Sequence, residues 1–219
     1  MSKIVILGAG KSGIGAAILG KKKGYDVFVS DKNEIDKNLK DFLSKQGIQF
    51  EAGKHSIENM KSADFIIKSP GISTDSDVIK KLIHEGKEII SEIEFAARYT
   101  SATLIGITGT NGKTTTTMLT YKILKDSGLN VGIAGNIGDS FAFQVAINNF
   151  DYYVLEISSF QLDDIREFAP HISVITNITP DHLDRYNYSF NKYIKSKLKI
   201  LKNQSETDFF LFNAGDPVL

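Results

Sequence analysis

The sequence contains no cysteine, which excludes several kinds of chemistry. Disulfide bridges, thiolate metal sites and cysteine nucleophiles all need this residue. The chain also has no excess of charge of either sign, because its 26 basic and 26 acidic residues balance. This balance gives no indication of a nucleic-acid-binding face or of an acidic tail.

Long hydrophobic runs are absent as well. The apolar run Ile4–Leu7 is far too short for a signal peptide or a membrane span, and it leads directly into a glycine-rich turn. We therefore expect a cytoplasmic protein without a membrane span. The 219 residues, 42% hydrophobic and 24% charged, have an ordinary globular composition and suffice for one large or two small domains.

Apolar, β-rich runs alternate with helical patterns along almost the whole chain, which predicts an α/β fold with mostly parallel sheets. The strand runs are continuously apolar, as is typical of sheets buried on both faces. We expect strands at Lys3–Leu7, Asp26–Ser30, Ile48–Glu51, Phe65–Ile67, Glu88–Ile90, Leu104–Thr108, Val131–Ala134, Tyr152–Glu156, Ile172–Asn177 and Asp208–Phe212. We expect helices near 13–23, 36–46, 76–85, 92–99, 113–127, 139–148 and 189–202.

A glycine-rich turn follows the first strand of each half of this pattern, so we predict two successive α/β units that meet near Ser91–Thr103. Residues 1–92 form a Rossmann-like domain in this prediction. Residues 93–219 form the first part of a P-loop-type α/β ATPase domain. The sequence stops at NAGDPVL, shortly after a strand, where another helix is expected. This ending is typical of part of a larger protein.

The first glycine-rich turn is a full G-x-G-x-x-G, Gly8 to Gly13, between a predicted strand and a predicted helix. Asp31 stands at the end of the next strand. Glycines let the backbone approach a diphosphate, and the acidic side chain can bind ribose hydroxyls. From these residues alone the ligand is NAD, a UDP-linked molecule or another nucleotide. A purely structural turn is the remaining alternative.

A second feature of the same unit is Ser69-Pro70-Gly71-Ile72, which follows the fourth strand. It lies at the carboxyl edge of the predicted sheet, where open α/β folds bind their ligands. The alternative is a simple turn, for which Pro-Gly favours type II geometry.

The second glycine-rich turn, Gly109-Thr110-Asn111-Gly112-Lys113-Thr114, has the pattern of a phosphate-binding loop. N–H groups at a helix N-terminus bind phosphate, Lys113 can reach β- and γ-phosphates, and the Thr114 hydroxyl can bind Mg²⁺. The match is imperfect, because Ile107 stands where the ordinary P-loop has its first glycine. The alternative is a strand–helix turn with a surface lysine.

Polar residues follow three later strands. Asn136 and Glu156 each end a strand, where a P-loop fold places Mg²⁺ and substrate ligands. His182 follows the next strand, within NITPDHLDRY. A solvated glutamate and a surface cluster around His182 are the alternatives.

Tyr193 and Lys197 lie one helical turn apart, so both side chains should share a helix face. The helix is rich in lysine, and the alternative for Lys197 is therefore a solvated surface position.

Taken together, TGTNGKTT, AGN, EISSFQL, NITPDHLDRY and YIKSKLKI resemble the Mur ligase family over essentially the whole chain. The G-x-G-x-x-G turn, SPGI and EISSFQL resemble the member that adds D-glutamate. The resemblance implies an ATP-dependent amide ligase of peptidoglycan precursor synthesis, acting on UDP-N-acetylmuramoyl-L-alanine through an acyl phosphate. It also implies a monomer, and a longer chain with the rest of the central domain and a C-terminal domain.

The resemblance further implies roles for individual residues. The residues for ATP are Gly109, Thr110, Asn111, Gly112, Lys113, Thr114 and Thr115. The residues for the UDP substrate are Gly10, Lys11, Ser12, Asp31, Gly71, Asn136, Ser158, Gln161 and His182. Two Mg²⁺ sites would use Thr114, Glu156, His182 and a carbamylated Lys197, and the catalytic residues would be Lys113, His182 and Lys197.

Two positions depart from the family pattern. Lys11 stands where an apolar residue is common, and Asn33 stands where some members have an arginine beside the uracil. Two other functions compete with the ligase. An NAD(P)-dependent oxidoreductase would use the first turn but leaves Lys113, Glu156 and His182 unexplained. A non-catalytic nucleotide-binding module is the other alternative.

Overall fold

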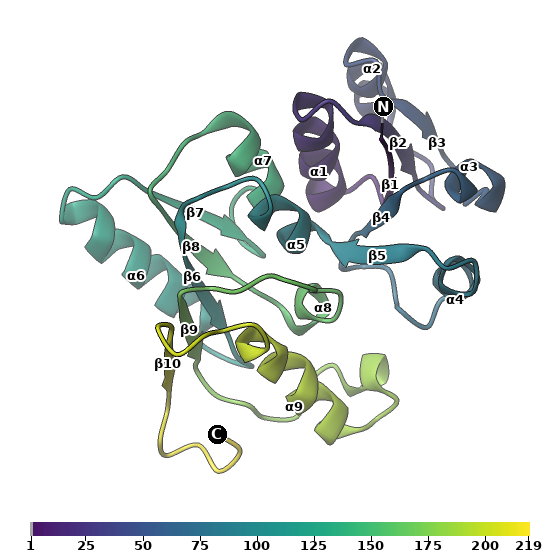
Figure 1. The fold of residues 1–219 in the computed structure, drawn as a ribbon. Helices are drawn as coiled ribbons and strands as arrows, with labels where there is room; N and C mark the ends of the chain where they lie inside the picture. The colour runs from purple at the N-terminus through teal and green to yellow at the C-terminus, as the bar shows by residue number, and fades with distance from the viewer. Residues whose placement is uncertain (1) are drawn as a thin grey trace.

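The computed structural model describes residues 2–219 and contains two five-stranded parallel sheets. The first sheet has the strand order β3-β2-β1-β4-β5 and the second β10-β9-β6-β8-β7 (Figure 1). All strand pairs are parallel. The predicted α/β class with parallel sheets is therefore confirmed.

The first sheet and its helices run from Lys3 to Ser91. Its strands are β1 (Lys3–Leu7), β2 (Asp26–Ser30), β3 (Gln49–Glu51), β4 (Phe65–Lys68) and β5 (Glu88–Ser91). Its helices are α1 (Lys11–Lys22), α2 (Lys37–Lys45), α3 (Ile57–Lys61) and α4 (Asp77–His84).

The second sheet follows α5 (Glu92–Ala97). Its strands are β6 (Thr103–Thr108), β7 (Val131–Gly135), β8 (Tyr152–Glu156), β9 (Ile172–Ile175) and β10 (Phe209–Phe212). Its helical segments are α6 (Lys113–Asp126), α7 (Phe141–Ile147), α8 (Ser159–Leu162), η1 (Leu183–Tyr186), α9 (Phe190–Leu198) and η2 (Lys199–Leu201).

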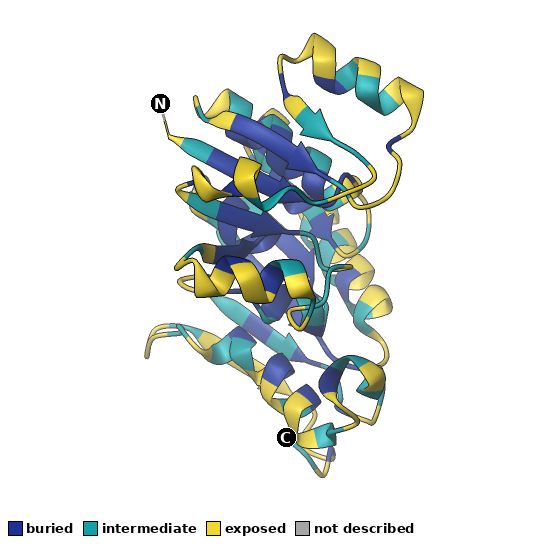
Figure 2. Cartoon of the chain, turned by 90° about the vertical axis from the view of Figure 1, so that its right-hand side faces the viewer, coloured by how far each residue is buried: buried dark blue, intermediate teal, exposed yellow. Residues whose placement is uncertain are grey.

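The central strands are buried on both faces, as their apolar sequences predict. Ile4 to Leu7 of β1 are fully buried, and Figure 2 shows buried residues gathered in the strands with exposed ones on the outer sides of the helices. Two edge strands differ: β3 has no buried residue, and all four side chains of β10 are exposed. The apolar sequence of β10 suggested burial, but β10 occupies an edge of the second sheet, beside β9 alone.

The two sheets are joined by close packing of α1 against α7 (Figure 1). A Cβ on Gly15 of α1 would lie 1.9 Å from Ser140 Oγ, so only glycine allows this approach. Glu92, fully buried at the start of α5, accepts a hydrogen bond from the backbone N–H of Ala142 in α7. These contacts fix the two units against each other.

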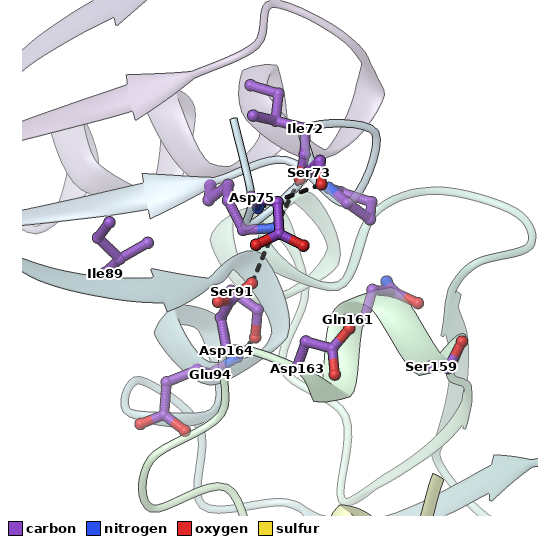
Figure 3. Close-up of polar contacts among 12 residues, drawn as sticks. Ile72, Ser73, Asp75, Ile89, Ser91, Glu94, Ser159, Gln161, Asp163 and Asp164 are labelled. Atoms are coloured by element: carbon purple, nitrogen blue, oxygen red, sulfur yellow. Dashed lines mark hydrogen bonds and ion pairs between the residues drawn. The ribbon is translucent and has the colours of Figure 1, made fainter. Parts of the chain in front are cut away.

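A buried ion pair links the units at a second point. Lys68 Nζ lies 2.8 Å from Asp164 Oδ2, and it also donates to the carbonyl oxygen of Ile72 at 2.8 Å. Figure 3 shows Ile72 and Ser73 of the first unit above Asp164, with Asp163 beside it at the end of α8. Within residues 2–219, no helix is both long and apolar enough to cross a membrane.

Candidate functional site

The first glycine-rich turn has the geometry that its sequence predicts. Gly8 has φ of +95°, a conformation that residues with a side chain rarely adopt. A Cβ on Gly13 would lie 1.9 Å from the Gly8 carbonyl oxygen, so α1 can begin this close to β1 only with glycine there. Asp31 Oδ2 accepts from Ala9 N at 2.7 Å and Oδ1 from Asn33 N at 2.8 Å. The carboxylate therefore holds the turn in place.

A cavity of about 570 Å³ opens beside this turn. It brings together the residues of the first unit that the resemblance assigns to the UDP substrate: Gly10, Lys11, Ser12, Asp31 and Gly71. Asn33 also lines it, together with Lys32 and His55, which the sequence reasoning did not single out. His55 follows the carboxyl end of β3, so a systematic reading of every strand end could have found it.

The segment Ser69–Ile72 forms a turn at the rim of this cavity, closed by a hydrogen bond from Ile72 N to Ser69 O of 3.0 Å. Type II geometry, expected from Pro-Gly, is wrong here, because Gly71 is not among the residues with positive φ. The Lys68 ammonium donates a hydrogen bond to the Ile72 carbonyl and so stabilises the turn.

The second glycine-rich turn is anchored to the segment after β9. Thr110 Oγ1 donates to the Thr179 carbonyl at 3.0 Å, and Asn111 N donates to Asn177 Oδ1 at 3.0 Å. Gly112 caps α6 with φ of +79°. The first N–H groups of α6 have no partners within the helix, which leaves them for an anion.

Lys113 is the first residue of α6, and its side chain folds back over this turn. Its Nζ donates to the Thr110 carbonyl at 2.8 Å. The side chain lines a cavity with residues from other elements, so it is not a lysine on the open surface.

Glu156 ends β8 as a buried carboxylate, 1% exposed, and the solvated alternative is therefore wrong. Oε2 accepts from Thr114 Oγ1 at 2.6 Å and Oε1 from Asn136 Nδ2 at 2.7 Å. Both partners are neutral, so the buried negative charge would gain from a cation. Mg²⁺ fits this place, because it takes one or two carboxylates and completes its shell with phosphate oxygens and water. Within residues 2–219, no cluster of three or more acidic, histidine or cysteine ligands is present.

Lys197 is also buried, 1% exposed, which rules out the solvated position that its lysine-rich helix suggested. Nζ donates to the Gly109 carbonyl at 2.6 Å and lies 4.7 Å from the centre of the Tyr193 ring. The predicted shared face of these two side chains is thus confirmed. Burial, which has the largest effect, and the Lys113 charge together lower the pKa of Lys197 to about 7, while the Asp181 charge opposes both. A large share of the amine is therefore neutral near pH 7.

His182 has φ of +48°, which is uncommon for a residue with a side chain. Its ring is half exposed, lies 5.3 Å from the Phe160 ring and contacts Asp181 through Nε2 at 3.5 Å. The contact with Asp181 agrees with a surface cluster, but the ring also faces a cavity. Strained backbone of this kind often marks a functional position.

These side chains converge on one cavity of about 130 Å³. Its lining comes from α6, from the residue after β7, from α8 and its N-cap, from the loop after β9 and from α9: Lys113, Asn136, Ser158, Ser159, Phe160, Asp181, His182, Tyr193 and Lys197. A space beside the phosphate-type loop is thus surrounded by the Lys113 ammonium, the Lys197 amine, an imidazole, the Asp181 carboxylate and several neutral donors. Such a site can hold anionic groups of two ligands next to each other.

Gln161 lies behind this cavity. Its side chain is buried, and Oε1 accepts from Ser158 N at 2.9 Å and from Ser158 Oγ at 3.0 Å. The Ser158 hydroxyl in turn accepts from Gln161 N, which completes a capping box at the start of α8. Gln161 therefore orients Ser158, and contact of Gln161 itself with a substrate stays a prediction.

Comparison with known proteins matches both parts of the chain. Residues 3–78 match the MurD N-terminal domain, and residues 107–219 match the Mur ligase middle domain. A UDP-N-acetylmuramoylalanine–D-glutamate ligase of Bacteroides fragilis is 54% identical over 219 residues, covering 100% of this chain and 49% of that protein. The ligase of the same name from Christiangramia forsetii is 52% identical over 98% of this chain and 48% of its own length.

Solved structures show the same fold. A UDP-N-acetylmuramate-alanine ligase MurC from Thermotoga maritima aligns over 100% of this chain and 50% of its own, with 25% identity and a TM-score of 0.61. A UDP-N-acetylmuramate:L-alanyl-gamma-D-glutamyl-meso-diaminopimelate ligase from Neisseria meningitides has 21% identity and a TM-score of 0.67 over 100% of this chain and 73% of its own. The chain spans about half the length of the curated relatives that it matches.

Proposed function

Because this chain belongs to the Mur ligase family, we propose that it is part of an ATP-dependent ligase that joins D-glutamate to UDP-N-acetylmuramoyl-L-alanine. The names of the relatives at 48–54% identity support this substrate pair. The observation that carries the proposal is the cavity where Lys113, His182 and Lys197 meet beside the phosphate-type loop. ATP and the nucleotide precursor are cytoplasmic compounds, so the proposed place of action is the bacterial cytoplasm.

The two parts of the chain have different functions in this proposal. Residues 1–92 bind the UDP part of the substrate at the first glycine-rich turn, in the cavity of about 570 Å³. Residues 93–219 form the first part of the ATP-binding domain, with Gly109 to Thr115 around the phosphates. Asn136, Ser158 and His182 face the muramoyl-alanine end of the substrate, because they line the cavity that Lys113 also lines.

The proposed reaction forms an amide in two steps. The alanyl carboxylate oxygen attacks the γ-phosphorus of ATP, the bond to ADP breaks, and an acyl phosphate results. The amine of D-glutamate then attacks the acyl carbon, loses a proton, and phosphate leaves. The phosphates and the carboxylate repel one another, so Lys113 and the α6 N-terminus act by holding these anions together.

Mg²⁺, when bound, neutralises the same charges. Thr114 and Glu156 would hold one ion, because the buried Glu156 carboxylate has only neutral partners. His182 and Lys197 would serve the second. Lys197 can do so only as a carbamate, in which CO₂ joins the neutral amine, a proton is released and an anionic oxygen replaces the ammonium. The lowered pKa of Lys197 supports this modification, because it supplies the neutral amine.

The proposal is tested by replacing Lys113 in the full-length ligase. We expect Lys113→Ala to reduce phosphate release by about a hundredfold to a thousandfold, because it removes the cation nearest the transferred phosphoryl group. Lys125→Ala, at the other end of α6, is the matched control and should leave turnover unchanged. A Lys113→Ala enzyme with near-normal phosphate release would refute the assignment of the loop.

A further inference from the structure

The cavity at the first glycine-rich turn contains an imidazole to which none of the roles above is assigned. His55 follows β3, is half-buried and lines the cavity together with Asp31 and Lys32. Its Nδ1 lies 2.7 Å from the hydroxyl oxygen of Ser30, the last residue of β2. The orientation of the ring is therefore set by the sheet from which Asp31 also extends.

The neighbours of Ser30 determine which ring nitrogen carries the proton. Ser30 Oγ lies 2.7 Å from Glu51 Oε1. Burial raises the pKa of Glu51, but hydrogen bonds from Ser56, Ser30 and Asn59 outweigh burial and hold that pKa below its usual value. An ionised carboxylate only accepts, so the Ser30 hydroxyl donates to Glu51. His55 must then donate from Nδ1 to Ser30 Oγ.

The other ring nitrogen, Nε2, is left as an acceptor. Burial lowers the pKa of His55, Lys32 acts in the same direction, and Asp31 and Glu51 oppose them. The net lowering favours the neutral ring, whose Nε2 then carries a lone pair. Nε2 points away from Ser30, and within residues 2–219 no hydrogen bond reaches it.

The acceptor capacity of Asp31 is only partly free for a nucleoside, out of the roughly four lone-pair sites that a carboxylate has. Both of its oxygens already accept from the backbone N–H groups of Ala9 and Asn33. His55 offers an acceptor in the same cavity that is not used to hold the turn.

We propose that His55 recognises the nucleoside of the UDP substrate, with Nε2 accepting a hydrogen bond from a ribose hydroxyl or from the imide N–H of uracil. The inference rests on the proposed function and adds a specificity-determining residue to it. Ser30 and Glu51 are positioning residues, because they act through the tautomer of His55.

Two substitutions separate binding from a structural role. Asn places its amide nitrogen where Nδ1 stands, so His55→Asn keeps the bond to Ser30 but loses the acceptor at Nε2. Gln reaches the position of Nε2, so His55→Gln keeps the acceptor and loses the bond to Ser30. Calorimetric titration with UDP should show about tenfold weaker binding for His55→Asn and a smaller loss for His55→Gln. His84→Asn, exposed at the end of α4 and outside the cavity, is the matched control.

Two analogues identify the donor. Wild-type protein should bind either 2′-deoxy-UDP or N3-methyl-UDP more weakly than UDP, according to which group donates to Nε2. His55→Asn should lose that discrimination. Nitrogen NMR of the wild-type ring provides a second measurement without any substitution: the Nε2 resonance should move on saturation with UDP, while Nδ1 stays protonated.

The outcomes distinguish this inference from the proposed function. If UDP does not bind the wild-type chain at all, both are wrong. If UDP binds but His55→Asn matches wild type, or only His55→Gln weakens binding, His55 has a structural role and the ligase proposal stands. If both variants unfold, an Nε2 resonance that is unmoved by UDP overturns the inference by itself.

Discussion

At the scale of single residues, Lys197 and Glu156 show how burial turns ordinary side chains into candidate ligands. Lys197 shares α9 with the exposed Lys192 and Lys195, yet its own amine is buried against the Gly109 carbonyl. Glu156 is buried with only neutral hydrogen-bond donors. The Glu156 carboxylate therefore lacks a positive partner among the side chains around it, whereas burial of Lys197 favours its neutral amine.

The lowered pKa of Lys197 predicts carbamylation that depends on pH. Only the neutral amine reacts with CO₂, so the carbamate should increase as the pH rises through about 7. Carbon NMR in ¹³C-bicarbonate should show one carbamate signal in this chain, lost in Lys197→Ala and kept in the control Lys195→Ala. In the full-length ligase, Lys197→Ala should lose activity and regain part of it with short carboxylic acids. A fully active Lys197→Ala enzyme would show that the lysine has no such role.

The residues of the site were partly predictable from the sequence. Lys113, Asn136, His182 and Lys197 follow strand ends or share a helix face, and the structure brings them to one cavity. Burial was not predictable, because the lysine-rich helix gave Lys197 the pattern of a solvated residue. His55 was missed because a single histidine in a short loop carries no periodic signal.

At the scale of elements, the strands were predicted well and the short helices were not. All ten expected strands are present with similar bounds. The segments α3, α8 and η1 have four or five residues each, too few for a helical hydrophobic pattern to appear. The expected helix over 189–202 continues beyond α9 only as the 3₁₀ turn η2.

The junction between α5 and α7 should respond to pH through Glu92. Burial raises the pKa of Glu92 from 4.5 to about 7, while the bond from Ala142 N opposes this change. The folded pKa lies above the unfolded one, so the folded chain retains the proton and its stability falls as the pH rises from 4.5 through 7.

Glu92→Gln imitates the protonated form, so at pH 8 its free energy of unfolding should exceed that of wild type. This difference between variant and wild type should be about 1–3 kcal/mol larger at pH 8 than at pH 5. Urea unfolding at both pH values measures this difference, and Glu88→Gln on the exposed start of β5 is the control. A difference between Glu92→Gln and wild type that is equal at both pH values would mean that Glu92 does not titrate on folding.

At the scale of the whole molecule, the two units, each with its own glycine-rich turn, are packed into one connected structure. The α1–α7 packing and the Lys68–Asp164 pair join them. These contacts connect residues far apart in the sequence, so no local pattern predicts them. The division at residues 92 and 93 stays a prediction, since the two units pack against each other closely around α5.

The Lys68–Asp164 pair should be important for the stability of this joined structure. Asp164→Asn leaves a buried ammonium without its counter-ion, and we expect a loss of about 3 kcal/mol in the free energy of unfolding. Lys68→Met combined with Asp164→Asn should recover part of the loss. Asp75→Asn, in an exposed pair with Lys80 at 3.9 Å, should change little. Equal effects of Asp164→Asn and Asp75→Asn in urea unfolding would argue against a role for the buried pair.

Calorimetric titration of the chain with UDP-N-acetylmuramoyl-L-alanine, and separately with NADH, tests the central claim most directly. The ligase proposal predicts saturable binding of the UDP-sugar and none of NADH, because the first glycine-rich turn would bind the diphosphate of the sugar nucleotide. Binding of NADH without binding of the UDP-sugar would contradict the proposal and favour an oxidoreductase.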